Sequence, residues 1–131
     1  TGKSISVKQF ISLCCNFVGI EVDFKNKGVD EIGYIKRLDN DKFYKAVGTK
    51  NNLLKVGKEI IRVDPFYYRP TEVDELIGDF SKAKKILGWE PTFTVKALAE
   101  DMMKSDIKLM KRESLLKSEG HSSFPSVEDV L

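Results

Sequence analysis

A change of hydrophobic period at Gly19 constrains the fold of this chain more than any other feature. Between residues 4 and 18, apolar side chains recur every three or four positions, which indicates an amphipathic helix. Ser6 and Gln9 have the spacing of a capping box at its start, and Gly19 is a typical helix end. Residues 20–24 then alternate apolar and acidic side chains, the pattern of a half-buried strand. A helix that leads directly into a strand predicts a small mixed α/β domain.

The middle of the chain, residues 25–58, is polar and contains glycines at positions 28, 33, 48 and 57. We interpret it as mostly loop, with short strands possible at residues 33–38 and 43–47. A loop of this length inside a small domain is often functional, although a simple surface excursion is the plainer alternative. Residues 58–63 are a further strand candidate, and residues 76–78 form a short run of extended type.

Two helices are predicted after residue 78. Asp79 can accept hydrogen bonds from the amides of Ser81 and Lys82, so we expect it to start a helix that ends at Gly88. Thr94 is expected to cap the last long helix, one face of which carries all three methionines of the chain as core filler. From residue 114 onward the sequence becomes more polar. We therefore divide the chain into a domain at residues 1–113 and a loosely held tail at residues 114–131.

Composition bounds the partners of the chain. Its 131 residues suffice for one domain, and its 22 basic and 20 acidic residues are interspersed, for a net charge of +2. No basic field indicates nucleic acid, and no apolar run approaches the ~20 residues that span a bilayer. Cys14 and Cys15 lie among apolar residues and are predicted to be buried thiols in a reducing compartment, the cytoplasm. The first residues show no signal-peptide pattern, and because the chain starts at Thr1 and not at an initiator Met, we expect an excised or processed piece.

The motifs of the common catalysts are absent from this sequence. There is no Gly-x-Gly-x-x-Gly turn for a dinucleotide, no phosphate-binding loop and no Tyr-x-x-x-Lys pair. His121, the single histidine, lies in the predicted tail, and two adjacent cysteines do not give the ligand spacing of a zinc site. Several carboxylates cluster between residues 64 and 79. They are not spaced along a regular helix or strand, so they do not define an acid–base pair. We therefore assign no catalytic, cofactor-binding or metal-binding residue.

Residues 63–74 combine aromatic residues, two prolines, one arginine and several carboxylates, which is poor core material and good ligand-site material. Because Pro70 pushes Arg69 into an extended conformation, Arg69 and Glu72 are expected to flank a bend. The rigid donor fork of Arg69 suits a phosphate, and Glu72 could accept hydrogen bonds from sugar hydroxyls. The alternative is a surface turn in which the two residues form an ion pair of little energetic value.

The same stretch resembles part of a known family. Residues 69–74 (Arg-Pro-Thr-Glu-Val-Asp), 78–84 and 87–91 (Leu-Gly-Trp-Glu-Pro) resemble the C-terminal part of the GDP-mannose 4,6-dehydratases. These enzymes belong to the extended short-chain dehydrogenase/reductase superfamily, whose members widely share the second motif, whereas Arg-Pro-Thr-Glu-Val is more particular to the GDP-mannose enzymes. Similar matches at residues 1–10 and 114–120 extend the resemblance over nearly the whole chain, and it is weakest at residues 36–58.

The resemblance implies a role in substrate binding. In this family an N-terminal Rossmann domain binds NADP and carries the catalytic residues, while a smaller C-terminal domain grips the sugar nucleotide. This chain is similar to the smaller domain, so we expect it to be inactive alone and to act within a homo-oligomeric enzyme. Arg69 matches the residue that contacts the diphosphate of GDP-mannose, and Glu72 matches the residue that bonds its ribose. The implied product is GDP-4-dehydro-6-deoxymannose, the precursor of GDP-fucose.

Phe66 departs from the family pattern, which usually has Arg or Lys at this position. The change has two possible consequences: a weaker attraction for anions nearby, or none if the position only packs. Two other functions stay open as well. One is a fragment of an extended-family epimerase, dehydratase or decarboxylase that acts on a UDP sugar. The other is a stand-alone, non-enzymatic binding module, which, unlike an excised domain, would expose no large apolar patch.

Overall fold

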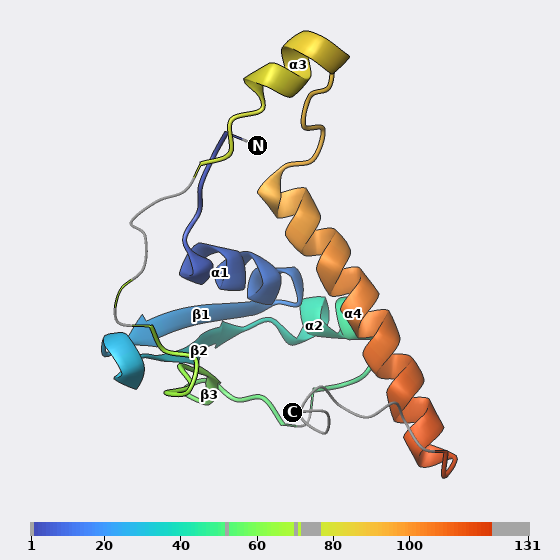
Figure 1. Cartoon of the computed structure of the whole chain (residues 1–131). Helices are drawn as coiled ribbons and strands as arrows, with labels where there is room; N and C mark the ends of the chain where they lie inside the picture. Colours follow the sequence, from blue (N-terminus) through green and yellow to red (C-terminus); the bar gives the residue numbers. More distant parts are fainter. Residues whose placement is uncertain (1, 52, 70, 72–76, 122–131) are drawn as a thin grey trace.

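The computed structural model describes residues 2–51, 53–69, 71 and 77–121. Within these ranges it is a mixed α/β structure, as predicted, with a three-stranded sheet flanked by helices (Figure 1). The elements follow in the order α1 (Val7–Phe17), β1 (Ile20–Lys25), the 3-10 turn η1 (Gly28–Asp30), β2 (Ile32–Leu38), α2 (Asn40–Val47), β3 (Glu59–Arg62), α3 (Ser81–Leu87) and α4 (Val95–Ser118).

The predicted helix-to-strand transition at Gly19 is confirmed. At the start of α1, the amide of Gln9 donates to Ser6 Oγ (3.2 Å) and the amide of Ser6 donates to Gln9 Oε1 (2.8 Å), which completes the capping box. Gly19 has a left-handed φ of +80°, and a side chain there would lie 2.7 Å from the carbonyl oxygen of Asp39. Glycine is therefore required at this position by both the backbone conformation and the space available.

The sheet is antiparallel in the order β1-β2-β3, and α1 lies along it with α4 packed beside α1 (Figure 1). Both pairings shift register, at Glu21/Val22 in β1 and at Gly33/Tyr34 in β2. The core is centred on Val18, Ile20 and Ile35. Half-buried side chains surround this cluster: Cys15, Phe17, Val22, Leu38, Phe43, Ala46, Val47, Leu54, Ile60, Met103 and Ile107.

The expected loop at residues 25–58 is largely structured. Its possible strand at residues 33–38 is confirmed as part of β2, but the possible strand at residues 43–47 is wrong, because these residues belong to α2. Asp39 caps α2 by accepting from the amide of Lys42 (2.9 Å). Phe43, Ala46 and Val47 have the three- and four-residue spacing of a helix face, and all three pack on the core. This helical pattern outweighs the strand propensity of its aromatic and branched residues.

The helix predicted to start at Asp79 is α3. Asp79 Oδ1 accepts from the amide (2.9 Å) and the hydroxyl (2.6 Å) of Ser81, but the helix itself begins at Ser81 with Phe80 as its N-cap. Its end at Gly88 is confirmed. Trp89 then packs edge-on against Phe80, with ring centroids 6.2 Å apart. Residue 76 lies outside the described residues, and residues 77 and 78 belong to no regular element.

The last helix, α4, is longer than predicted. Thr94 caps it as expected, accepting from the amide of Ala97 (3.1 Å), but the helix continues to Ser118, so the proposed boundary at residue 114 falls inside it. Whether residues 114–131 form a separate tail stays a prediction. Of the three methionines, Met103 packs on the core as predicted, whereas Met102 and Met110 are exposed, so the prediction was wrong for those two.

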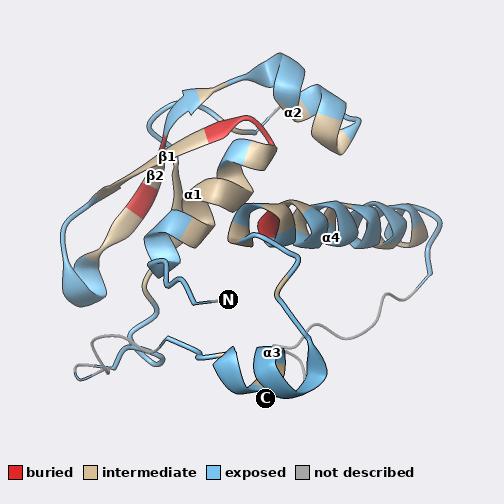
Figure 2. Cartoon of the chain, turned by 90° about the horizontal axis from the view of Figure 1, so that it is seen from above, coloured by how far each residue is buried: buried red, intermediate tan, exposed pale blue. Residues whose placement is uncertain are grey.

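Burial is uneven along the molecule. Figure 2 shows buried residues in the sheet, at the end of α1 and at one position of α4, whereas α3 is almost entirely exposed. Among the described residues, no helix is both long and apolar enough to cross a membrane.

Candidate functional site

A tight turn follows β3 and leads to Arg69. The amide of Val63 donates to the carbonyl oxygen of Glu31 (3.4 Å), which extends the pairing of β3 with the sheet. The carbonyl oxygen of Asp64 then accepts from the amide of Tyr67 (3.1 Å), and its carboxylate accepts from the amide of Phe66 (2.9 Å). Asp64 therefore fixes the turn with both its backbone and its side chain, as aspartate commonly does in turns.

The three aromatic residues of this turn lie on the surface. Phe66 is 85% exposed and meets the ring of Tyr67 edge-on, with centroids 5.0 Å apart. Tyr68 points toward η1, since a side-chain carbon added to Gly28 would lie 3.5 Å from the Tyr68 hydroxyl. Within the described residues Phe66 therefore packs on a neighbouring ring and adds nothing to the core. The family that the sequence resembles usually has Arg or Lys at this position, whereas this chain has the exposed apolar ring of Phe66.

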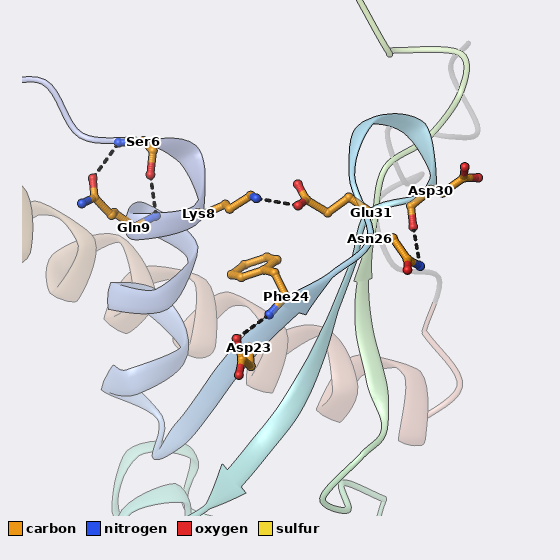
Figure 3. A network of polar contacts seen from close by, with 8 residues as sticks. All are labelled: Ser6, Lys8, Gln9, Asp23, Phe24, Asn26, Asp30 and Glu31. Atoms are coloured by element: carbon orange, nitrogen blue, oxygen red, sulfur yellow. Dashed lines mark hydrogen bonds and ion pairs between the residues drawn. The ribbon is translucent and has the colours of Figure 1, made fainter.

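The connection from β1 to β2 lies beside this turn, and Figure 3 shows the polar contacts that hold the connection in place. Asn26 has a left-handed φ of +65°, and its side-chain amide donates to the carbonyl oxygen of Asp30 (3.1 Å), which closes the η1 turn. Glu31 forms an ion pair with Lys8 of α1, and the Lys8 ammonium lies 5.5 Å from the centre of the Phe24 ring. The connection from β1 to β2 is thus anchored to both α1 and the sheet.

A hollow of about 960 Å³ lies between η1, β3 and the start of the turn. It is lined by Asn26, Lys27, Val29, Asp30, Ile32, Glu59, Arg62, Val63 and Pro65. Arg62 Nε lies 2.7 Å from Glu59 Oε1, and this hydrogen-bonded pairing raises the pKa of the Arg62 guanidinium. The hollow is therefore open, and its lining combines apolar side chains with charges of both signs.

The two predicted site residues are only partly placed. Arg69 is exposed and directly follows the turn. Glu72 lies outside the described residues, so the pairing of Arg69 with Glu72 around a bend stays a prediction. The η1 turn and the hollow were not predicted. The signal that could have found them is Asn26 two positions before Gly28, because both residue types favour left-handed turns.

The cysteines form no bond with each other in the structure. Cys14 and Cys15 are free and half-buried, so the prediction of fully buried thiols was too strong. Burial raises the pKa of both thiols; Asp106 adds to the effect for Cys14, and Cys14 itself adds to it for Cys15. The described residues contain no group of side chains that could hold a metal ion.

Comparison with known proteins gives a consistent result. A sequence model of the family described as "GDP-mannose 4,6 dehydratase" matches residues 1–102. The chain belongs to this family. It is 41% identical over 128 residues to a GDP-mannose 4,6-dehydratase of Vibrio cholerae and 42% identical over 120 residues to one of Yersinia enterocolitica. These matches cover 98% and 92% of the chain but only 32% and 30% of the relatives, so the chain spans about a third of their length.

Membership of the GDP-mannose 4,6-dehydratase family confirms the resemblance and agrees with the small α/β fold. An animal relative, from Drosophila melanogaster, is 39% identical over 115 residues, 88% of this chain and 25% of the relative. The matched residues 1–102 include the turn, Arg69 and the position of Glu72. The family match thus covers the whole candidate site, while the roles of its residues are a matter for the proposal below.

Proposed function

We propose that this chain is the sugar-nucleotide-binding part of a GDP-mannose 4,6-dehydratase, with the binding domain at residues 1–113. The observation that carries this proposal is the position of Arg69. It is exposed at the exit of a turn that Asp64 closes directly after the sheet, within the stretch that matches the family. The turn presents the arginine on the surface, and the planar donor fork of arginine suits recognition of a diphosphate.

In this proposal Arg69 and Glu72 bind different parts of the nucleotide. Arg69 donates to the diphosphate of GDP-mannose, and Glu72 accepts from the ribose hydroxyls. The hollow beside the turn leaves room for the ligand, and Lys27 at its lining adds a positive charge. Phe66 supplies no charge here, so the attraction for the anion comes from Arg69 and Lys27 rather than from the turn itself.

The described residues do not fit NADP, the cofactor that the family implies. A dinucleotide site is built where parallel strands lead into helices through a glycine-rich turn. The sheet of this chain is antiparallel in both pairings, and its sequence lacks the glycine motif. We therefore place NADP and the catalytic residues on an N-terminal Rossmann domain outside this chain. The intact enzyme would be a lyase of GDP-fucose synthesis, and this chain alone would be inactive.

Exposed apolar side chains around α3 support a missing partner domain. Ile86, Leu87, Trp89 and Phe93 are all more than half exposed, and Ile77 lies exposed before the helix. An apolar group of this size is typical of a surface that a partner covers. We infer that the Rossmann domain packs here, in a cytoplasmic homo-oligomer. Light scattering tests this against a stand-alone module: the isolated chain should self-associate, and a monomer at all concentrations would favour the module.

Two measurements test the enzymatic proposal. The purified chain, given NADP and GDP-mannose, should show no dehydration, because it lacks the catalytic residues; turnover by the chain alone would contradict this.

Competition between GDP-mannose and UDP-glucose for binding to the full-length protein tests the substrate class. We expect selectivity for the guanosine nucleotide, as the names of the relatives favour. Preference for UDP-glucose would point instead to an epimerase, dehydratase or decarboxylase of the wider superfamily.

A further inference from the structure

The turn that follows β3 is closed by hydrogen bonds from the backbone and from one side chain. The carbonyl oxygen of Asp64 accepts from the amide of Tyr67 (3.1 Å), and that of Pro65 accepts from the amide of Tyr68 (3.3 Å). In addition, Asp64 Oδ1 accepts from the amide of Phe66 (2.9 Å). The carboxylate of Asp64 thus closes an Asx-turn inside the first of two overlapping β-turns.

Both ends of this turn meet the connection from β1 to β2. Before the turn, the amide of Val63 donates to the carbonyl oxygen of Glu31 (3.4 Å). At its end, the Tyr68 hydroxyl lies 3.5 Å from where a side-chain carbon on Gly28 would be. Arg69 is the next residue and is exposed. The direction in which the chain leaves the turn therefore sets where the Arg69 side chain can reach.

Only the side-chain bond of Asp64 depends on the residue type at this position. Backbone groups are present in every residue and Pro65 fixes its own φ, so other residues at position 64 could still make the backbone bonds. The Asx-turn instead needs a side-chain oxygen. Asp64 is exposed, and its negative charge would oppose an anionic ligand. A favourable effect of Asp64 on such a ligand must therefore come from the conformation of the turn.

We propose that Asp64 is a positioning residue for Arg69. Its carboxylate holds the amide of Phe66 and so keeps the turn in the conformation from which Arg69 reaches the diphosphate of the nucleotide. A segment that is ordered before binding loses less conformational freedom on binding, which raises affinity without a new contact to the ligand. Asp64 has this role only if Arg69 binds the diphosphate, so the inference rests on the proposed function.

Two substitutions at Asp64 separate its hydrogen bond from its charge. Asp64→Ala and Asp64→Asn both remove the charge, but asparagine keeps a side-chain oxygen that can accept from the amide of Phe66. In calorimetric titrations of GDP into the full-length protein, we expect Asp64→Ala to bind about two- to tenfold more weakly than Asp64→Asn. A purely electrostatic effect of Asp64 would change the affinity of both variants equally.

Asp79→Ala is the matched control. Asp79 Oδ1 accepts from the amide of Ser81 at 2.9 Å, with the same spacing of two residues, but at the start of α3 instead of in the turn. Its loss should leave the affinity for GDP within about twofold. A larger loss in Asp79→Ala than in Asp64→Ala would show that the turn has no special part in binding and would overturn the inference.

A double-mutant cycle with Arg69→Ala tests whether Asp64 acts through Arg69. If it does, the difference between Asp64→Ala and Asp64→Asn should disappear in protein that also carries Arg69→Ala, because no guanidinium is left to position. A difference that persists without Arg69, or equal affinities of the two Asp64 variants when Arg69 is present, would overturn the inference alone. No binding of GDP to the wild type, or full affinity in Arg69→Ala, would overturn the proposed function and the inference with it.

Discussion

The body of the molecule and the α3 arm are held in place by different means. The body consists of α1, the sheet, α2 and the first half of α4, and its elements pack on the cluster of Val18, Ile20 and Ile35. The α3 arm, residues 77–93, has local contacts such as the ion pair of Lys84 with Glu90, and it meets the N-terminal residues where Phe80 lies beside Gly2. In Figure 1 the arm stands apart from the sheet.

This difference shows which part of the fold is self-sufficient. Burial of apolar side chains is the main favourable term in folding, and it is concentrated in the body. A seven-residue helix with local caps is marginal by itself, since most helical stability comes from tertiary packing. We therefore expect the arm to be less stable than the body in the isolated chain. Three substitution experiments separate the two regions.

The largest effect is expected from truncation of the core. Ile35 is 0% exposed, so Ile35→Ala should lower the free energy of unfolding by about 2–5 kcal/mol, through lost burial and a cavity. Ile86 in the arm is 66% exposed, and Ile86→Ala should cost less than about 0.5 kcal/mol. Urea denaturation followed by circular dichroism measures both. Equal costs for the two variants would mean that the arm already packs in the isolated chain.

The second-largest effect on stability is expected from substitutions at two glycines. Gly19 and Gly88 both have left-handed φ values, +80° and +66°, so alanine at either position is strained by about 1–2 kcal/mol. At Gly19 the new side chain would also meet the Asp39 carbonyl oxygen at 2.7 Å, whereas at Gly88 it meets nothing within 4 Å. Gly19→Ala should therefore shift the unfolding midpoint of the body markedly.

Gly88→Ala should instead lower only the helix content of the arm and leave that midpoint in place. Denaturation curves and helix content of the two variants decide the matter. If Gly88→Ala destabilised the body as much as Gly19→Ala, the arm and the body would unfold as one unit, and the distinction between them would be wrong.

The smallest effect concerns the charge at the start of the arm. Hydrogen bonds from the hydroxyl and the amide of Ser81 hold the pKa of Asp79 below its ordinary value. A lowered pKa means that the ionised carboxylate favours the folded arm, so this contribution is present above the pKa of the unfolded chain. It is lost as the pH falls through the lower, folded value.

In Ser81→Ala the hydroxyl bond is absent, so the pKa of Asp79 should rise toward its ordinary value. Carboxyl NMR titration of the wild type and the variant measures the change. Identical midpoints would show that the start of α3 is not formed in solution.

Local signals predicted most of the fold. The capping box of Ser6, the strand after Gly19 and the cap at Thr94 each depend on neighbours in the sequence, and all three are confirmed. The helix α2 was missed because the polar stretch around it masked the spacing of Phe43, Ala46 and Val47. The exposure of Met110 could not be read from its periodicity, because periodicity gives a face of the helix but not what lies opposite.

The candidate site was predicted less completely. Sequence chemistry pointed to Arg69, and the structure places it on the surface after the turn, but Glu72 lies outside the described residues. The contacts that shape the hollow join residues far apart in the chain, such as Tyr68 with Gly28 and Glu31 with Lys8. No pattern within one segment carries that information, because only the sheet and the packing of α1 on it bring these segments together.

The most direct test of the account is a calorimetric titration of GDP into the chain and two arginine variants. A hydrogen bond to a charged group contributes about 1.5–3 kcal/mol, so Arg69→Ala should weaken GDP binding roughly ten- to hundredfold. Arg37→Ala, which removes an exposed arginine that is paired with Glu21 and lies outside the hollow, should leave the affinity within about twofold. Equal affinities for the wild type and Arg69→Ala, or no binding of GDP to the wild type, would contradict the account.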